Sequence, residues 1–117
     1  MRPFIENFPY SSPRLALSPV FPDYVEEVKL AAETSTLVPI PDGARFALFS
    51  FDASVRVRLG TKTTVLAEPR LTTDGSGGEW NPAARRIPDF LPDGVTRPTH
   101  LCLRAAAATL GSVSFYA

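Results

Sequence analysis

The sequence predicts an all-β fold: a single small antiparallel β-sandwich or jelly-roll-like barrel of six to eight strands, with an extended Pro-rich N-terminal arm. Short apolar segments recur at a spacing of roughly 8–12 residues, and turn residues separate them. Several of these segments alternate apolar and polar side chains, the period of a half-buried strand. Since 117 residues suit one domain, we expect an arm over residues 1–23 and a β-sandwich domain over residues 24–117.

The arm is recognised by its prolines and its apolar side chains. Five of the 12 prolines fall within residues 1–22, where they disfavour both helix and central strand. Disordered tails are poor in aromatic residues, whereas this segment is rich in them. We therefore expect an extended interface segment that packs on a neighbouring subunit or a larger assembly through Phe4, Phe8, Tyr10, Leu15, Leu17 and Phe21.

The first strand is expected within residues 24–32. There Val28 and Leu30 fall on one face, and Glu27 and Lys29 fall on the other. This alternation is typical of a strand with one face on the core and the other in solvent.

The next two strands are separated by a turn. Residues 36–41 contain Pro39, which indicates an edge position or a bulge because proline cannot donate to a ladder. The sequence "PDG" at residues 41–43 favours a turn. Residues 44–51, "ARFALFSF", are almost continuously apolar, which predicts a strand covered on both sides.

Clean alternation predicts a further strand over residues 54–60, in which Arg56 and Arg58 face away from the apolar set. Residues 61–69, "TKTTVLAEP", are expected to continue as another strand. The Pro- and Gly-rich residues 81–98 predict a long irregular crossing.

Two strands are expected at the end of the chain. In residues 100–105, Leu101 and Leu103 face opposite Cys102, and residues 112–116 alternate around Val113 and Phe115. We expect these two strands to pair as a hairpin through "AATLG". A single helical turn in the alanine run between them is a weaker alternative.

Composition argues against several classes of function. The formal net charge is zero, so no general basic excess is available for binding nucleic acid. The single histidine and the single cysteine, His100 and Cys102, cannot supply a disulfide or a typical zinc site. No apolar run approaches the ~20 residues of a membrane span, and the N-terminus lacks the features of a signal peptide. We expect a protein made in the cytoplasm, without nucleic acid or membrane as a partner.

The stretch "DGSGGEWNPAARR", residues 74–86, holds three glycines in four positions and the only tryptophan. A phosphate loop requires Lys-Ser/Thr after the glycines, whereas Glu79 follows here. A calcium loop requires more oxygen ligands at regular spacing. We therefore expect no metal and no cofactor, and we interpret the stretch as a surface loop. Trp80 is expected to make a core or subunit contact, with stacking on a carbohydrate as the alternative.

The arginines of this loop are expected to act in protein contacts. Arg85 and Arg86, with the two strand arginines, form a possible basic patch, and arginine pairs well with carboxylates across subunit interfaces. With Trp80 they constitute the predicted loop interface. No nucleophile or acid–base constellation accompanies His100 and Cys102, and Asp89 and Asp93 lie in a loop where turn formation explains them. We expect no enzymatic activity.

Three segments together carry a resemblance to a known class. The run "VPIPDGARFALFSFDASVRVRLG", the "DGSG" and "NPAARRIPD" segments and the terminal "THLCLRAAAATLGSVSFYA" resemble small β-sandwich virion proteins of tailed bacteriophages. The resemblance covers roughly residues 36–117 and includes no catalytic motif. "DFLP" at residues 89–92 lengthens the segment that follows "RRIPD" in such sequences.

The resemblance implies a structural role in the virion, assembled in the host cytoplasm. Among such roles, a capsid decoration (cement) protein is favoured. It is expected to self-associate as a homo-oligomer, most simply a trimer, and to contact the major capsid protein or other virion proteins. A neck or tail component is the alternative, and a carbohydrate-binding or receptor-binding module is a third hypothesis.

Overall fold

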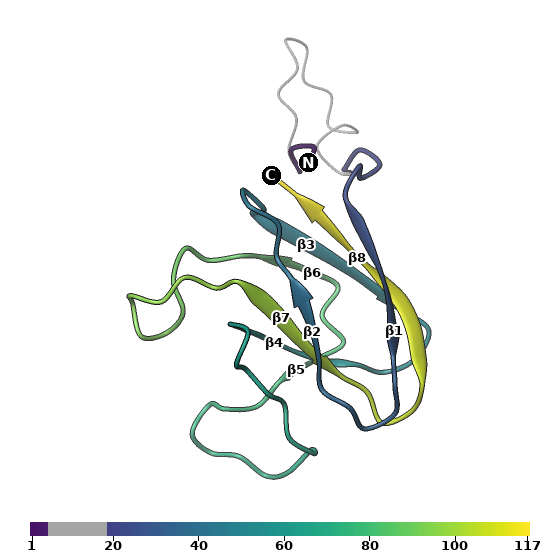
Figure 1. Ribbon diagram of the computed structural model, residues 1–117, viewed down its shortest axis with the longest axis vertical. Coiled ribbons are helices and arrows are strands. Elements are labelled where there is room, and N and C mark those ends of the chain that lie inside the picture. The colour runs from purple at the N-terminus through teal and green to yellow at the C-terminus, as the bar shows by residue number, and fades with distance from the viewer. Residues whose placement is uncertain (5–18) are drawn as a thin grey trace.

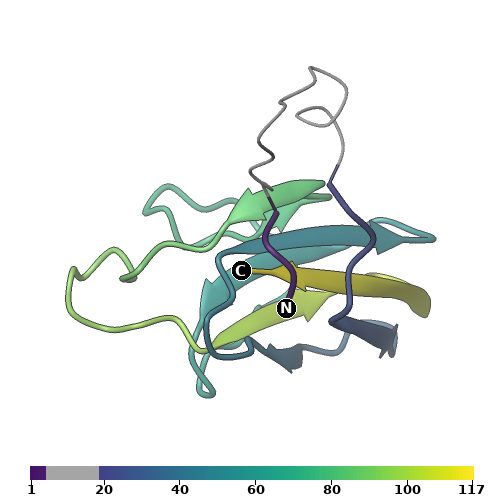
Figure 2. The same ribbon diagram turned by 90° about the horizontal axis from the view of Figure 1, so that it is seen from above.

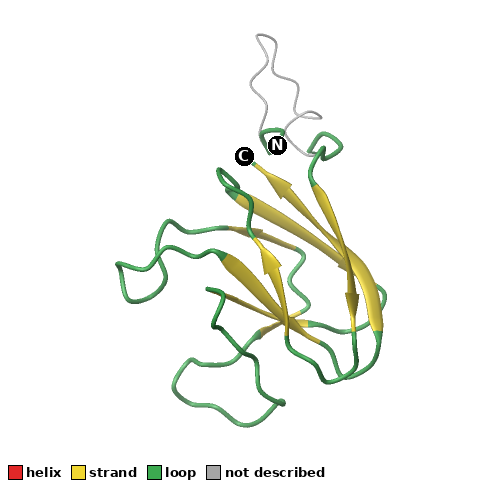
Figure 3. Ribbon diagram, viewed as in Figure 1, coloured by secondary structure: helices red, strands yellow, loops and turns green. Residues whose placement is uncertain are grey.

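Two four-stranded antiparallel sheets form the protein. The structure, a computed structural model, describes residues 1–4 and 19–117, and within them every regular element is a strand (Figures 1 and 3). The strands are β1 (Val25–Leu30), β2 (Thr36–Pro39), β3 (Phe46–Phe51), β4 (Arg56–Gly60), β5 (Glu79–Trp80), β6 (Ala84–Arg86), β7 (His100–Arg104) and β8 (Thr109–Tyr116). The all-β prediction is confirmed.

The strand order is that of a jelly roll. Sheet 1 has the order β1-β8-β3-β6 and sheet 2 the order β2-β7-β4-β5. The pairs β1·β8, β2·β7, β3·β6 and β4·β5 are all antiparallel, so the second half of the chain runs back along the first. Rolling up this long hairpin of four strand pairs joins β3 to β8 and β4 to β7 and closes the two layers seen in Figure 2.

The core lies between the two sheets. Its buried side chains come from alternate residues along each strand, those that point inward, which is why the period of two in the sequence locates them. The fully or almost fully buried members include Leu30, Val38, Ala47, Val57, Leu101, Leu103, Val113 and Phe115. Val28 and Leu30 are buried whereas Glu27 and Lys29 are exposed, as predicted for the first strand, and Pro39 lies on the edge strand β2.

The predicted terminal hairpin is wrong, because β7 and β8 lie in different sheets. The alanine-rich connection crosses from one layer to the other and contains no helical turn. It runs beside the β1–β2 connection: Ala105 forms a parallel bridge with Ala32, and the Glu33 N–H donates to Ala105 O at 2.8 Å. Strand β7 pairs with β2 and β4, and β8 pairs with β1 and β3, all antiparallel. The short connection between β7 and β8 therefore does not determine their pairing.

The predicted strand at residues 61–69 is also wrong. This segment begins with a turn in which the Thr64 N–H donates to Thr61 O at 3.1 Å, and it continues as a loop over the outer face of sheet 2. Leu66 is only 2% exposed there. The loop explains why Cys102, on the outer face of β7, is completely buried.

The prediction that both faces of the strand in residues 44–51 are covered is confirmed only in part. Ala47 is buried against the core, and Phe46 is covered on the outer face by Phe4. Ser50, also within β3, is exposed. The outer face of sheet 1 is therefore covered at one end only.

The described ends of the arm pack on their own domain, beside the end of β8 (Figure 1). Phe4 stacks on Phe46 with ring centroids 4.8 Å apart and meets Tyr116 edge-on at 5.5 Å. The Ala117 N–H donates to Arg2 O at 2.9 Å, and the Tyr116 hydroxyl donates to Val20 O at 2.8 Å. Phe4, predicted to contact a neighbouring subunit, thus contacts its own chain. Phe21 is 91% exposed, and Phe8, Tyr10, Leu15 and Leu17 lie outside the described residues.

Candidate functional site

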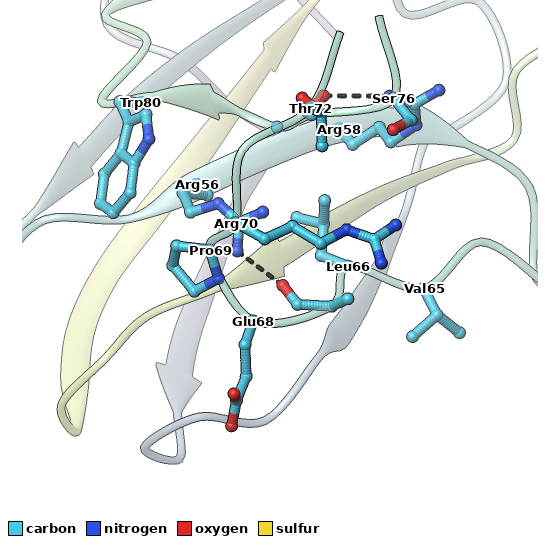
Figure 4. Close-up of a pocket in the computed structure, with 13 residues that line it drawn as sticks. Arg56, Arg58, Val65, Leu66, Glu68, Pro69, Arg70, Thr72, Ser76 and Trp80 are labelled. Atoms are coloured by element: carbon cyan, nitrogen blue, oxygen red, sulfur yellow. Dashed lines mark hydrogen bonds between the residues drawn. The ribbon is translucent and has the colours of Figure 1, made fainter. Parts of the chain in front are cut away.

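A groove of about 320 Å³ lies on the outer face of sheet 2. Strand β4 forms its floor, and the loop of residues 65–72 and the glycine loop that leads into β5 form its walls (Figure 4). Arginines lie on its floor, and Trp80 and the hydroxylated residues Thr72 and Ser76 lie at its rim. The groove is lined by Arg56, Arg58, Leu66, Arg70, Ser76 and Trp80, among others.

The strand register builds the floor of the groove. Arg56 on β4 is paired with Trp80 on β5 on one side and with Arg104 on β7 on the other. Directly opposed residues project to the same face of a sheet, so these three side chains form a row across sheet 2. Arg58, two residues along β4, lies on the same face.

The arginines hold the covering loops through backbone carbonyl groups. Arg56 Nη1 donates to Ala67 O at 2.7 Å, and Arg104 Nη1 donates to Leu66 O at 3.1 Å. Arg58 Nη1 donates to Gly77 O at 2.9 Å and to Gly75 O at 3.3 Å. The strand face predicted to carry a basic patch is thus roofed by loops, and Arg56 is only 7% exposed.

The arginines of the groove form no ion pair with an acidic side chain of the described residues, and Arg70 has an electrostatic partner in Asp74, whose pKa it helps to lower. The ion pairs in the described part of the chain are those of the Met1 amine with Asp23 and of Arg85 with Glu79. Neither involves an arginine of the groove. The Glu68 carboxylate points away from the arginines in Figure 4.

Trp80 stands at the rim with 54% of its surface exposed. The Arg56 guanidinium carbon lies 5.8 Å from the centre of its ring, a cation–π arrangement. The prediction that Trp80 fills the core is therefore wrong, while a contact with a partner or with a sugar stays a prediction.

The glycine run permits close packing at this corner. A Cβ at Gly78 would lie 3.1 Å from Leu66 Cδ2 and 3.3 Å from Arg56 Cβ, so a side chain there would require these neighbours to shift by a few tenths of an ångström. Asp74 accepts hydrogen bonds from the Ser76 hydroxyl and N–H, and these bonds hold the pKa of Asp74 below its usual value. After β5, Asn81 exchanges hydrogen bonds of 2.9 Å and 2.8 Å with the backbone of Val55, which fixes the turn.

Arg85 and Arg86 lie on β6, at the edge of sheet 1, and not in the groove. The Arg85 guanidinium donates to both carboxylate oxygens of Glu79. These bonds lower the pKa of Glu79 and raise that of Arg85. Arg86 is exposed and forms no side-chain hydrogen bond with the described residues. The predicted basic patch therefore divides into two separate sites.

The other candidate residues have structural surroundings. Cys102 Sγ lies 2.9 Å from the Ser35 hydroxyl, and His100 Nδ1 lies 2.9 Å from the Thr99 hydroxyl. Asp93 accepts hydrogen bonds from the Val95 and Thr96 N–H groups, the turn role predicted for it. Sequence reasoning misses Arg70 and Arg104, because nothing local places a loop arginine at the groove with Trp80 or a strand-end arginine beside Arg56.

The described residues show neither a metal-ligand cluster nor a membrane-spanning helix. Residues 1–4 and 19–117 hold no group of three or more potential metal ligands among His, Cys, Asp and Glu. No helix of this part of the chain is long and apolar enough to cross a membrane. No family model matches the chain, and comparisons with curated proteins and with solved structures returned no match.

Proposed function

We propose that the protein is a structural component of a bacteriophage virion, a capsid decoration protein that self-associates as a trimer on the shell. The observation that carries the proposal is the apolar surface where the arm enters β1. Phe21 is 91% exposed, Val25 is 45% exposed and Tyr24 is 37% exposed. Exposed apolar residues that gather in one region are typical of a protein–protein contact.

The edge of sheet 1 supports the same role. Strand β1 is an outer strand, with β8 on one side and no strand among the described residues on the other. An open edge next to apolar side chains offers both backbone hydrogen bonds and apolar area to a neighbouring subunit. Burial of that area contributes roughly 25 cal/mol per Å².

The jelly-roll order agrees with a virion role by analogy alone. Viral capsid domains adopt double-sheet jelly rolls, but lectin domains and cupins do so too. The fold is therefore compatible with the virion role and with the carbohydrate-binding alternative.

The test must leave the packed end of the arm intact, because residues 1–4 contact their own domain. One variant replaces residues 5–18 by a Gly/Ser linker of the same length, and a second carries Phe21→Ala. The matched control is Leu71→Ala, since Leu71 is 92% exposed on the loop over sheet 2.

Mass in solution by light scattering and co-sedimentation with virus particles are the two measurements. We expect the wild type and the control to form a trimer and to bind particles, and both arm variants to lose mass and binding. Retention of both properties when the two arm changes are combined would refute the role of the arm. A six- or twelve-fold ring on the portal axis would replace decoration by a neck or tail role.

A further inference from the structure

We propose that the groove on the outer face of sheet 2 binds an acidic sugar unit of a polysaccharide. In this site Arg56, Arg58 and Arg70 receive the carboxylate, and Trp80 stacks on the sugar ring. The groove lies on another sheet from the arm, and the proposal does not rest on the virion role.

The charge of Arg56 is the first argument. A buried cation is normally paired with an acidic group, because burial removes its hydration. Arg56 is only 7% exposed, yet no carboxylate of the described residues lies within 4.0 Å of its guanidinium nitrogens. Its protein partners there are one carbonyl oxygen and the face of Trp80.

Arg56 lines the groove and has donors without a partner among the described residues. A guanidinium carries five N–H donors, and only Nη1 of Arg56 donates to a described acceptor. Buried side-chain nitrogens without a partner do not occur among the described residues. Nε and Nη2 of Arg56 are therefore still accessible, and a planar carboxylate fits the paired donors of a guanidinium.

Two further arginines converge on the same space. Arg58 uses Nη1 for the glycine loop, which leaves Nε and Nη2 without an acceptor among the described residues. Arg70 is exposed and donates to no described acceptor, and Figure 4 shows its side chain extending across the groove. Three cations around one groove attract an anion strongly.

The rest of the lining favours a sugar over an acidic peptide. Trp80 offers an exposed aromatic surface, on which the apolar C–H face of a pyranose ring can stack. Thr72 and Ser76 provide hydroxyl groups at the rim for sugar hydroxyls. The volume of about 320 Å³ suits one or two sugar rings. A peptide carboxylate would satisfy the arginines but would bring no such ring face to Trp80.

The single tryptophan of the chain makes the test specific. We would titrate the protein with oligogalacturonate and follow tryptophan fluorescence, in parallel with calorimetry. The fully methyl-esterified oligosaccharide keeps the sugar rings and removes the charge. A poly-aspartate peptide tests the alternative class of partner.

Arg70→Gln is the informative variant, because Arg70 is exposed and holds no loop, so the fold is expected to persist. Arg86→Gln is its control: it makes the same change of charge at an exposed position on sheet 1. We expect saturable binding of oligogalacturonate that weakens as ionic strength rises, and about tenfold weaker binding by Arg70→Gln. Binding by Arg86→Gln should equal that of the wild type.

Three results would overturn the proposal. They are no response to oligogalacturonate, equal binding of the esterified oligosaccharide, and preferential binding of poly-aspartate. Loss of particle binding by the arm variants would not affect any of these measurements, so this proposal and the virion proposal can fail separately.

Discussion

Phe4→Ala should destabilise the domain, because Phe4 packs on its own chain. The change removes two aromatic contacts, with Phe46 and with Tyr116, at centroid distances of 4.8 Å and 5.5 Å. Each such pair contributes about 0.5–1.5 kcal/mol beyond its buried area. Loss of a partly buried ring adds about 1 kcal/mol. We expect the free energy of unfolding to fall by about 2–4 kcal/mol, which lowers the Tm by roughly 8–16 °C.

Phe21→Ala is the matched comparison within the same arm. Phe21 is 91% exposed, so its truncation should change the free energy of unfolding of the isolated subunit by less than about 0.5 kcal/mol. Urea unfolding followed by circular dichroism, at protein concentrations low enough to disfavour association, measures both variants. The reasoning fails if Phe4→Ala is as stable as the wild type, or if the two variants lose equal stability.

Two further predictions concern the loop cover and the C-terminal strand. Leu66→Ala should lower the free energy of unfolding by about 2–5 kcal/mol, because Leu66 is only 2% exposed. The same change should make the thiol of Cys102 reactive in the folded protein, because Leu66 belongs to the loop that covers that thiol. Urea unfolding and a thiol reagent measure these effects, and an unreactive thiol in a destabilised variant would contradict the covering role. Burial raises the pKa of Tyr116, so the folded state favours the neutral phenol. The contribution of this group to the free energy of unfolding is complete below the pKa of the unfolded state, near 10. It is lost as the pH rises through the higher pKa of the folded state. Unfolding measured between about pH 8 and about pH 12, on both sides of that value, should show a steeper alkaline loss of stability for the wild type than for Tyr116→Phe, and parallel curves would refute this.

Alternation within strands was predictable because it depends on local sequence alone. The period of two located the inward residues of β1, β4 and β8, such as Leu30, Val57 and Phe115, and proline marked the edge strand β2. Pairing between strands was not predictable in the same way. Strand β7 has apolar residues on both faces and is as compatible with β8 as with β2 and β4.

The groove escaped prediction for a related reason. Alternation indicates that Arg56 points away from the core, but it carries no information about a loop that returns to cover that face. Leu66, whose N–H donates to the Ser35 hydroxyl beside Cys102 Sγ, lies in an apolar run that is also typical of a strand. Arg70 and Trp80 are brought together only by the glycine loop, at a separation in sequence where no local pattern links them.

Peptide mass spectrometry of gradient-purified virus particles tests the proposed virion role most directly. The particles are taken from the lysate of phage-infected cells in which the gene for this chain is expressed. We predict that the chain copurifies with the particles in copy numbers comparable to those of the major capsid protein, as expected for decoration of the whole shell. Absence of the chain from the particles, with its full amount in the soluble fraction of the same lysate, would contradict the proposal.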